Sequence, residues 1–153
     1  MDLILWRHAE AFDADGGIDD LERALTPKGE RQARRMAEWL GRHLPSTAKV
    51  LASPARRCQQ TAQVLERKFK TVPALAPEGT VESLLAAVRW PDAREPVLVV
   101  GHQPTLGLTA AYLMAGVTMP WSVKKGALWW LRSRQRLTDS EVVLVTVRGP
   151  DNV

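Results

Sequence analysis

The sequence contains one cysteine, Cys58, among its 153 residues. An internal disulfide bond is therefore impossible, and this cysteine content is compatible with a reducing compartment. Cys58 has no second cysteine and no histidine at the spacing of a metal site, so we expect it to bind no metal.

A long hydrophobic run is also missing. The apolar stretch Leu3–Trp6 runs straight into Arg7 and His8. It is too short for the hydrophobic part of a signal peptide, and a membrane span needs about 20 residues. We therefore expect a cytoplasmic protein. Internal repeats, low-complexity tracts and interdomain linkers are absent too, which predicts one domain over residues 1–153.

The composition that remains is that of an ordinary globular protein. Hydrophobic residues make up 45% and charged residues 25% of the chain, which is enough for a sizeable core. A net charge of +4 and an isoelectric point near 9.6 favour anionic partners. These values alone leave phosphate, nucleic acid and membrane surfaces open.

The stretch Leu3–Glu10 is an apolar run that ends abruptly in Arg7 and His8. Apolar side chains at odd and even positions predict a central parallel strand that is covered on both faces. Ligands bind at the carboxyl edge of open α/β sheets, which is where Arg7 and His8 would lie. The alternative is a strand that ends in two solvated polar residues.

The polar loop 11–24 holds a cluster of acidic residues. A calcium loop of the EF-hand type would need a ligand where Gly17 stands, so that interpretation fails. We expect a solvated surface loop, long enough to act as a lid over a neighbouring site.

Thr26 and Pro27 have the residue types of an N-cap and a first helical position, and they predict the start of a helix. The arginines on the polar face of this helix could contact nucleic acid. They lack interleaved aromatic residues and a nucleic-acid motif, so we interpret them as a solvated face.

Ser53 and Pro54 predict a second helix by the same capping logic. At about 100° per residue, Arg56 points away from the apolar face of this helix and into water. Arg57 lies near the border of that face in the first turn, where free N–H groups and the helix dipole favour an anion.

Alternating strands and helices continue to the end of the chain. The predicted elements are a weak strand at 71–76, a helix at 81–88, a strand at 96–100 that leads into Gly101 and His102, a helix at 105–114, and two strands at 127–131 and 141–147 joined by a basic turn at 132–140. We expect the tail 148–153 to be frayed. This order predicts an α/β fold, a three-layer α/β/α sandwich with a mostly parallel central sheet and a C-terminal antiparallel hairpin.

Three of these elements deliver cationic or titratable side chains to one sheet edge. One strand ends in Arg7 and His8, another leads to His102, and a helix N-terminus carries Arg57. The sequence offers these groups no obvious counter-charge, so an anion should occupy the pocket. Arginine matches a tetrahedral oxyanion by bidentate hydrogen bonding, which points to phosphate.

A histidine in such a pocket could act as a nucleophile. Nearby arginines lower the pKa of an imidazole, and a neutral imidazole can attack phosphorus. Arg7, Arg57 and His102 would then stabilise the negative charge of the transition state. A metal site on His8 and His102 is the rival interpretation, but it lacks a third ligand and is surrounded by cations.

Four segments resemble the motifs of the histidine phosphatase superfamily, whose fold is phosphoglycerate mutase-like. Leu5–Glu10 resembles the RHG-type motif, Leu25–Ala33 resembles LTxxGxxQA, Ser53–Ala62 resembles SPxxRxxQTA, and Val99–Pro104 resembles the second-histidine segment. All four occur in the family's order over nearly the whole chain. The small size and the Gln-Pro pair after His102 are most similar to the SixA-type phosphohistidine phosphatase branch.

The resemblance implies roles for individual residues. His8 would be the phospho-accepting nucleophile, and Arg7, Arg57 and His102 would form the phosphate pocket. Arg23 would be a substrate contact. Ala9 stands where the family usually has glycine, which makes the backbone after His8 less permissive. No metal or other cofactor is implied.

The general acid is the main departure from the larger members of the family, which carry it in an insertion that this chain lacks. Glu78 and Glu82 lie in the corresponding stretch, but neither sits in a matching motif. A site without an acid favours a good leaving group, and the imidazole of phosphohistidine leaves more easily than an alkoxide.

We therefore expect a metal-independent phosphatase that removes phosphate from phosphohistidine on a protein, such as a phosphotransfer domain. One alternative is a small-molecule phosphomonoesterase that uses Glu82 or Glu78 as proton donor. The other is a non-catalytic module that binds phosphate or nucleic acid. We expect a monomer with no nucleic-acid or membrane partner.

Overall fold

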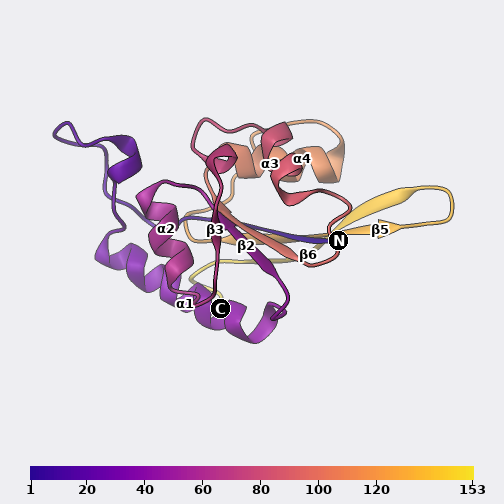
Figure 1. Ribbon diagram of the computed structural model, residues 1–153, viewed down its shortest axis with the longest axis horizontal. Coiled ribbons are helices and arrows are strands. Elements are labelled where there is room, and N and C mark those ends of the chain that lie inside the picture. The colour runs from indigo at the N-terminus through magenta and orange to yellow at the C-terminus, as the bar shows by residue number, and fades with distance from the viewer.

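The strand predicted at the N-terminus lies inside a six-stranded sheet (Figure 1). The computed structural model describes all 153 residues. In it β1 (Asp2–Arg7) pairs in parallel with β4 (Val97–Gly101) and antiparallel with β5 (Leu128–Gln135). The remaining strands are β2 (Lys49–Ala52), β3 (Lys70–Thr71) and β6 (Ser140–Arg148). The sheet order is β3-β2-β4-β1-β5-β6, in which β1 to β4 are parallel and β5 and β6 form the antiparallel hairpin.

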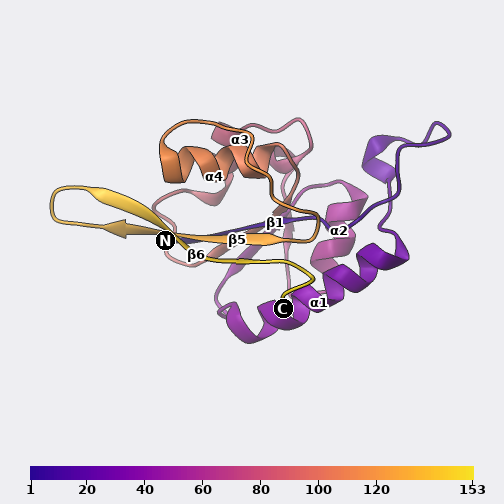
Figure 2. The ribbon, with the colours of Figure 1, turned by 180° about the vertical axis from the view of Figure 1, so that it is seen from behind.

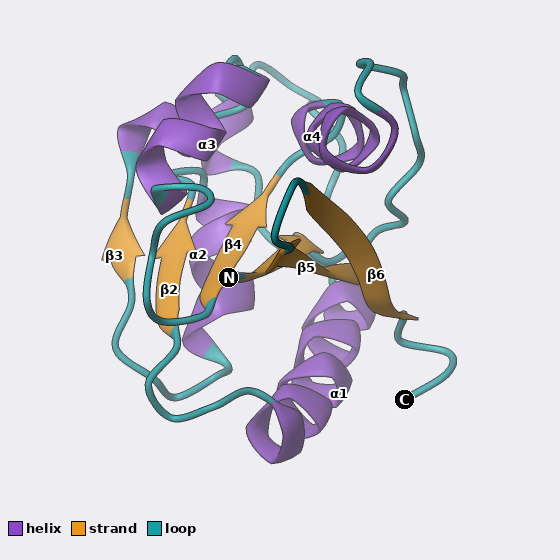
Figure 3. Cartoon of the chain, turned by 90° about the vertical axis from the view of Figure 1, so that its right-hand side faces the viewer, coloured by secondary structure: helices purple, strands orange, loops and turns teal.

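Helices cover both faces of the sheet, as the three-layer prediction requires. Figure 3 shows α1 (Pro27–His43) and α2 (Arg56–Gln63) on one side and α3 (Val81–Val88) and α4 (Thr105–Ala115) on the other. The predicted fold class is confirmed. None of these helices combines the length and the apolar character that a bilayer crossing requires.

The core explains why β1 is apolar at four consecutive positions, Leu3–Trp6. Its side chains alternate between two hydrophobic clusters, one under α1 and α2 and one under α3 and α4. Ile4 and Trp6 enter the first cluster, Leu3 and Leu5 enter the second, and all four are completely buried. Packing on both faces therefore fixes the carboxyl end of β1, which leads into His8.

Three local predictions are wrong. Residues 71–76 form only the end of the two-residue strand β3 and a short 3₁₀ turn, η2 (Pro73–Leu75). The first hairpin strand extends into the predicted turn 132–140, because Arg134 and Gln135 still pair with β6. These outer residues are exposed, so the strand shows no apolar alternation there.

The C-terminal tail is not frayed throughout. Arg148 belongs to β6, and its guanidinium lies 5.6 Å from the ring centre of Trp39 on α1. Arg35 donates a hydrogen bond to the carbonyl oxygen of Pro150 at 3.2 Å. These contacts attach the start of the tail to α1.

The acidic loop 11–24 projects from one end of the molecule, and the hairpin tip projects from the other (Figures 1 and 2). A bridge between Ala11 and Leu25 closes the base of the loop. The loop contains the 3₁₀ turn η1 (Asp20–Glu22), whose N-cap Asp19 accepts a hydrogen bond from the backbone N–H of Leu21. This turn packs against α2, next to the candidate site.

Candidate active site

The two predicted histidines come together because β1 and β4 are neighbours. Arg7 pairs with Gly101, and the backbone N–H of His8 donates to the carbonyl oxygen of Gly101 at 3.1 Å. The imidazole centres of His8 and His102 lie 5.3 Å apart. Both side chains are buried, with 7% and 3% of each residue exposed.

Arg57 reaches the same place from the first turn of α2. It is 3% exposed, whereas the adjacent Arg56 is exposed, so the distinction made from helical phase is confirmed. The Nη2 atom of Arg57 lies 3.4 Å from Nδ1 of His102. His8, Arg57 and His102 therefore converge, as the sequence predicted.

Two guanidinium groups at the site, that of the half-buried Arg7 and that of the buried Arg57, lack part of their hydrogen bonding. Arg7 donates from Nη1 to the carbonyl oxygen of Val123 at 3.0 Å, but its Nε atom and that of Arg57 are buried without an acceptor. Burial also lowers the pKa of Arg7. Because an unsatisfied buried donor costs about 1–3 kcal/mol, the pair suits a site that a bound anion completes.

His8 presents one free ring nitrogen. Its Nδ1 atom lies 2.7 Å from the carbonyl oxygen of Ala9, which can only accept, so Nδ1 carries the proton. Burial, together with the charges of Arg57 and Arg7, lowers the pKa of His8 to about 4. At neutral pH, Nε2 of His8 therefore holds a lone pair.

The backbone after His8 does not need a glycine at position 9. Ala9 is completely buried and has a negative φ. Alanine therefore fits this position without the steric strain of a left-handed backbone conformation. Its N–H donates to Oγ1 of Thr61 on α2 at 3.2 Å. The substitution of alanine for the family's glycine thus leaves the backbone next to the histidine in an ordinary conformation.

His102 is neutral in the opposite tautomer. Arg57 can only donate, so Nδ1 of His102 accepts and Nε2 carries the proton, which it donates to Oγ of Ser53 at 2.7 Å. Burial lowers the pKa of His102 to about 3, and the charges of His8 and Arg57 contribute. Cys58 Sγ lies 3.4 Å from Nε2, and burial raises the pKa of this thiol to about 12.

Ser53 has a different role from the one predicted. The N-cap position of α2 is Ala55, which makes no side-chain capping bond. The hydroxyl of Ser53 instead accepts from the N–H of Ala55 at 3.2 Å and from His102. It therefore orients the second histidine rather than capping the helix.

The expectation that the pocket has no counter-charge is wrong. Arg57 donates to the backbone oxygen of Asp20 at 2.7 Å and to its carboxylate at 3.1 Å. Arg23 donates from Nε to the same carboxylate at 2.9 Å and also to the carbonyl oxygen of Phe12. Burial pushes the pKa of Asp20 up, but these hydrogen bonds outweigh it, and the pKa falls below its ordinary value.

The converging side chains line a cavity of about 270 Å³. Its lining residues are Arg7, His8, Ala11, Asp13, Arg23, Arg57, Pro77, His102, Gln103 and Lys125. Glu78 and Glu82 are exposed and do not line it, so the structure does not bring either predicted proton donor to the site. Asp13 is the one carboxylate residue of the lining.

Comparison with known proteins agrees with this geometry. The family model described as histidine phosphatase superfamily (branch 1) matches residues 3–83. The chain belongs to the histidine phosphatase superfamily.

Relatives place the chain in the SixA-type branch of the superfamily. Phosphohistidine phosphatase SixA of Escherichia coli is 31% identical over 78% of both chains. A solved structure of protein histidine phosphatase SixA complexed with tungstate is 27% identical, covers 99% of both chains and superposes with a TM-score of 0.77. An uncharacterized protein of Picosynechococcus is 35% identical over 95% of this chain and 96% of its own. A hydrolase of the phosphatase kind is the activity that these relatives support.

Sequence reasoning missed several residues of this histidine phosphatase site. Ser53 was assigned to a helix cap, and Asp20 and Asp13 lie in a loop without periodicity. Lys125 lies in a turn before β5, where no motif marks it. Gln103 stands beside His102, and its amide bridges the carbonyl oxygen of Trp121 and the N–H of Gly107 at 2.8 Å each.

The rival metal interpretation finds no support in the arrangement of ligands. The structure contains no group of three or more His, Cys, Asp and Glu side chains that could hold a metal ion. His8 and His102 instead have a guanidinium beside them, which repels a cation.

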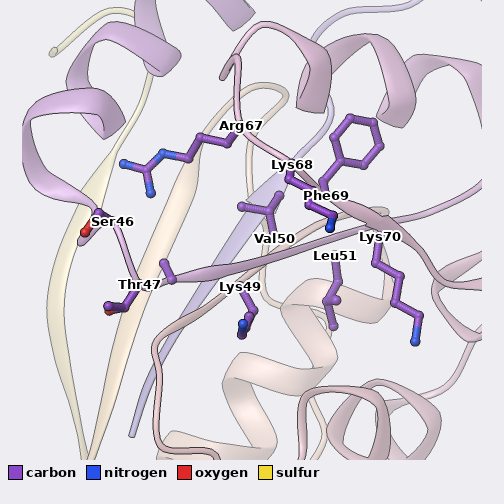
Figure 4. Close-up of a pocket in the computed structure, with 10 residues that line it drawn as sticks. Ser46, Thr47, Lys49, Val50, Leu51, Arg67, Lys68, Phe69 and Lys70 are labelled. Carbon is purple, nitrogen blue, oxygen red and sulfur yellow. The ribbon is translucent and has the colours of Figure 1, made fainter.

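A larger hollow, of about 880 Å³, lies between β2 with the residues before it and the segment that leads into β3 (Figure 4). It is lined by residues 46–51 and 67–70 and contains none of the predicted site residues. Lys70 belongs to the edge strand β3, where lysine keeps an exposed strand from pairing with another chain, and Lys68 lies two residues before it. We assign no chemistry to it.

Proposed function

We propose that the protein is a metal-independent phosphatase that removes phosphate from phosphohistidine on a protein, through a phosphohistidine intermediate on His8. The observation that carries this proposal is the free Nε2 lone pair of a buried, neutral His8 beside Arg57 and Arg7. Relatives named phosphohistidine phosphatase, from Escherichia coli and Haemophilus influenzae, support the substrate class.

Binding of the phosphoryl group would begin with the arginines. The substrate's oxygens accept from the buried guanidinium N–H groups that lack acceptors, and these charges offset the dianion. Asp20 then has to share or yield its contact with Arg57, because both anions use the same guanidinium.

Phosphoryl transfer follows in two displacements. Nε2 of His8 attacks phosphorus, the bond to the substrate imidazole breaks, and that imidazole leaves as a neutral molecule when its other nitrogen carries a proton. Water then attacks the phosphorus on His8, the P–N bond breaks, and phosphate is released. Arg7 and Arg57 stabilise the charge on the transferring oxygens. His102, which is neutral and has both ring nitrogens engaged with Arg57 and Ser53, holds the guanidinium of Arg57 in position.

The absence of both predicted proton donors from the cavity lining favours a substrate with a good leaving group. Glu78 and Glu82 are outside the cavity, so neither can protonate an alkoxide there. An imidazole leaving group needs no such donor. The position of these acids therefore favours a phosphoramidate substrate over a phosphate ester.

Asp13 favours a second candidate function, a small-molecule phosphomonoesterase. Asp13 lies in the projecting loop and lines the cavity, so its carboxyl group could protonate a leaving alkoxide. This candidate replaces the version that relied on Glu82 or Glu78.

The experiment that separates the two compares kcat/KM on a phosphohistidine-bearing phosphotransfer domain with kcat/KM on a series of sugar phosphates. We expect the phosphoprotein to be preferred by at least tenfold. A preference for any sugar phosphate would contradict the proposal and favour the esterase.

A further inference from the structure

Lys125 lies in a turn that is attached directly to the end of β1. The N–H of Gly126 donates to the carbonyl oxygen of His8 at 3.1 Å, and Trp6 Nε1 donates to the carbonyl oxygen of Gly126 at 2.9 Å. Arg7 adds two more bonds, from its N–H to Ala127 and from Nη1 to Val123, each at 3.0 Å. The backbone beside Lys125 is therefore fixed relative to His8.

The shape of this turn separates two adjacent lysines. Gly126 has a φ of +76°, and the N–H of Ala127 donates to the carbonyl oxygen of Lys124 at 2.9 Å, which closes the turn. Both lysines are exposed, but Lys125 lines the cavity and Lys124 does not. The chain thus contains a cation at the site and a matched cation one residue away.

Lys125 is the cation of the cavity that has no partner. Arg7 donates to Val123, while Arg23 and Arg57 donate to Asp20. The ammonium group of Lys125 makes no hydrogen bond and no ion pair, and Asp13, which also lines the cavity, lies beyond salt-bridge distance. It is available to a ligand without breaking an existing contact.

We propose that Lys125 binds a phosphoryl oxygen of the substrate and completes the set of cations around the transferring group. The inference rests on the proposed phosphatase function, which supplies the dianion. An ammonium group on a flexible stem suits this role, because it can follow the phosphoryl oxygens as the bond to the leaving group lengthens. Arg7 and Arg57, which are fixed by hydrogen bonds to Val123 and Asp20, cannot move in this way.

The test compares K125M with K124M, which remove the same charge from the same turn. Dissociation constants for inorganic phosphate are measured by calorimetry, and kcat/KM is measured on the phosphoprotein. We expect K125M to weaken phosphate binding and lower kcat/KM by about tenfold each, as loss of a hydrogen bond to a charged group does. K124M should stay within about twofold of the wild type, and K125R should recover most of the loss.

The outcomes separate this inference from the proposed function. Equal losses in K124M and K125M would show a general effect of charge and overturn the role of Lys125, as would unchanged phosphate binding in K125M. Phosphate binding needs no turnover. The dissociation constant for inorganic phosphate would therefore still test the role of Lys125 if the protein failed to hydrolyse phosphohistidine. Full turnover in K125M would contradict the proposed role of Lys125 and would leave the proposed phosphatase function intact.

Discussion

The guanidinium of Arg57 lies 3.4 Å from Nδ1 of His102, although 45 positions separate the two residues. This contact joins the first turn of α2 to the residue that follows β4. It also fixes the tautomer of His102, because arginine can only donate. The phosphate pocket is thus partly built before any ligand arrives.

Arg57 and Arg56 provide a matched pair of variants. R57A removes a buried charge beside both histidines and should lower kcat/KM by about 10²–10³, the usual effect of losing a preorganised group that stabilises the transition state. R56A removes an exposed charge one residue away and should stay within about twofold. Steady-state kinetics on the phosphoprotein make the comparison, and equal losses would contradict the assignment.

Asp20 should oppose the binding of phosphate. Its carboxylate neutralises Arg57 and Arg23 and repels a dianion, so D20N should bind inorganic phosphate severalfold more tightly. Calorimetry measures the change, and D15N, in the exposed part of the same loop, is the control. Weaker binding in D20N would mean that Asp20 chiefly holds Arg57 in place.

Three carboxylates differ in their access to the leaving group. E78Q and E82Q should leave every activity unchanged, because neither residue lines the cavity. D13N should leave phosphohistidine hydrolysis unchanged and slow the hydrolysis of alkyl phosphate esters, which need a proton donor. The assay is kcat on both substrate types for all three variants. A large loss for E78Q or E82Q would contradict the structure of the cavity.

Much of this site could be predicted from the sequence because its main residues end regular elements. Apolar runs placed His8 and His102 at one sheet edge, and helical phase separated Arg57 from Arg56. Asp20 could not be predicted in the same way. It lies in a loop without periodicity, so nothing in the pattern says that its turn folds back onto α2.

The differences between the predictions and the structure have separate physical causes. Glu78 and Glu82 match a proton donor only by their position along the chain, which does not determine where a loop or an exposed helix face points. Ser53 has the residue type of a helix cap, but a hydroxyl also serves as a partner for an imidazole. In the hairpin, the outer strand residues are exposed to solvent on both faces. Their sequence therefore has no apolar alternation from which the ends of the strands could be predicted.

The buried histidines should make stability depend on pH. The pKa values of about 4 and about 3 in the folded state lie below the ordinary value of 6.5, so the unfolded chain binds more protons as pH falls below 6.5. The contribution of the two histidines to the free energy of unfolding should therefore be fully present near pH 7 and decline toward pH 4. The decline is about 2 kcal/mol for each histidine between pH 6.5 and 5.

Urea unfolding at pH 7 and pH 5 measures this decline. The pKa values of Asp2 and Asp20 are lowered, so their contributions are lost only at more acidic pH and do not enter this window. The double variant H8A/H102A should lose about 4 kcal/mol less than the wild type between the two pH values. An unchanged difference would show that the two imidazoles are not neutral in the fold.

The central claim is that His8 carries the phosphoryl group during turnover. Rapid acid-free quenching of a reaction with a ³²P-labelled phosphohistidine protein, followed by mass spectrometry of the peptide that contains His8, tests it most directly. The account predicts transient label on Nε2 of His8, at a level that rises before free phosphate appears, and neither label nor turnover in H8A. Label on another residue, or full turnover by a folded H8A variant, would contradict it.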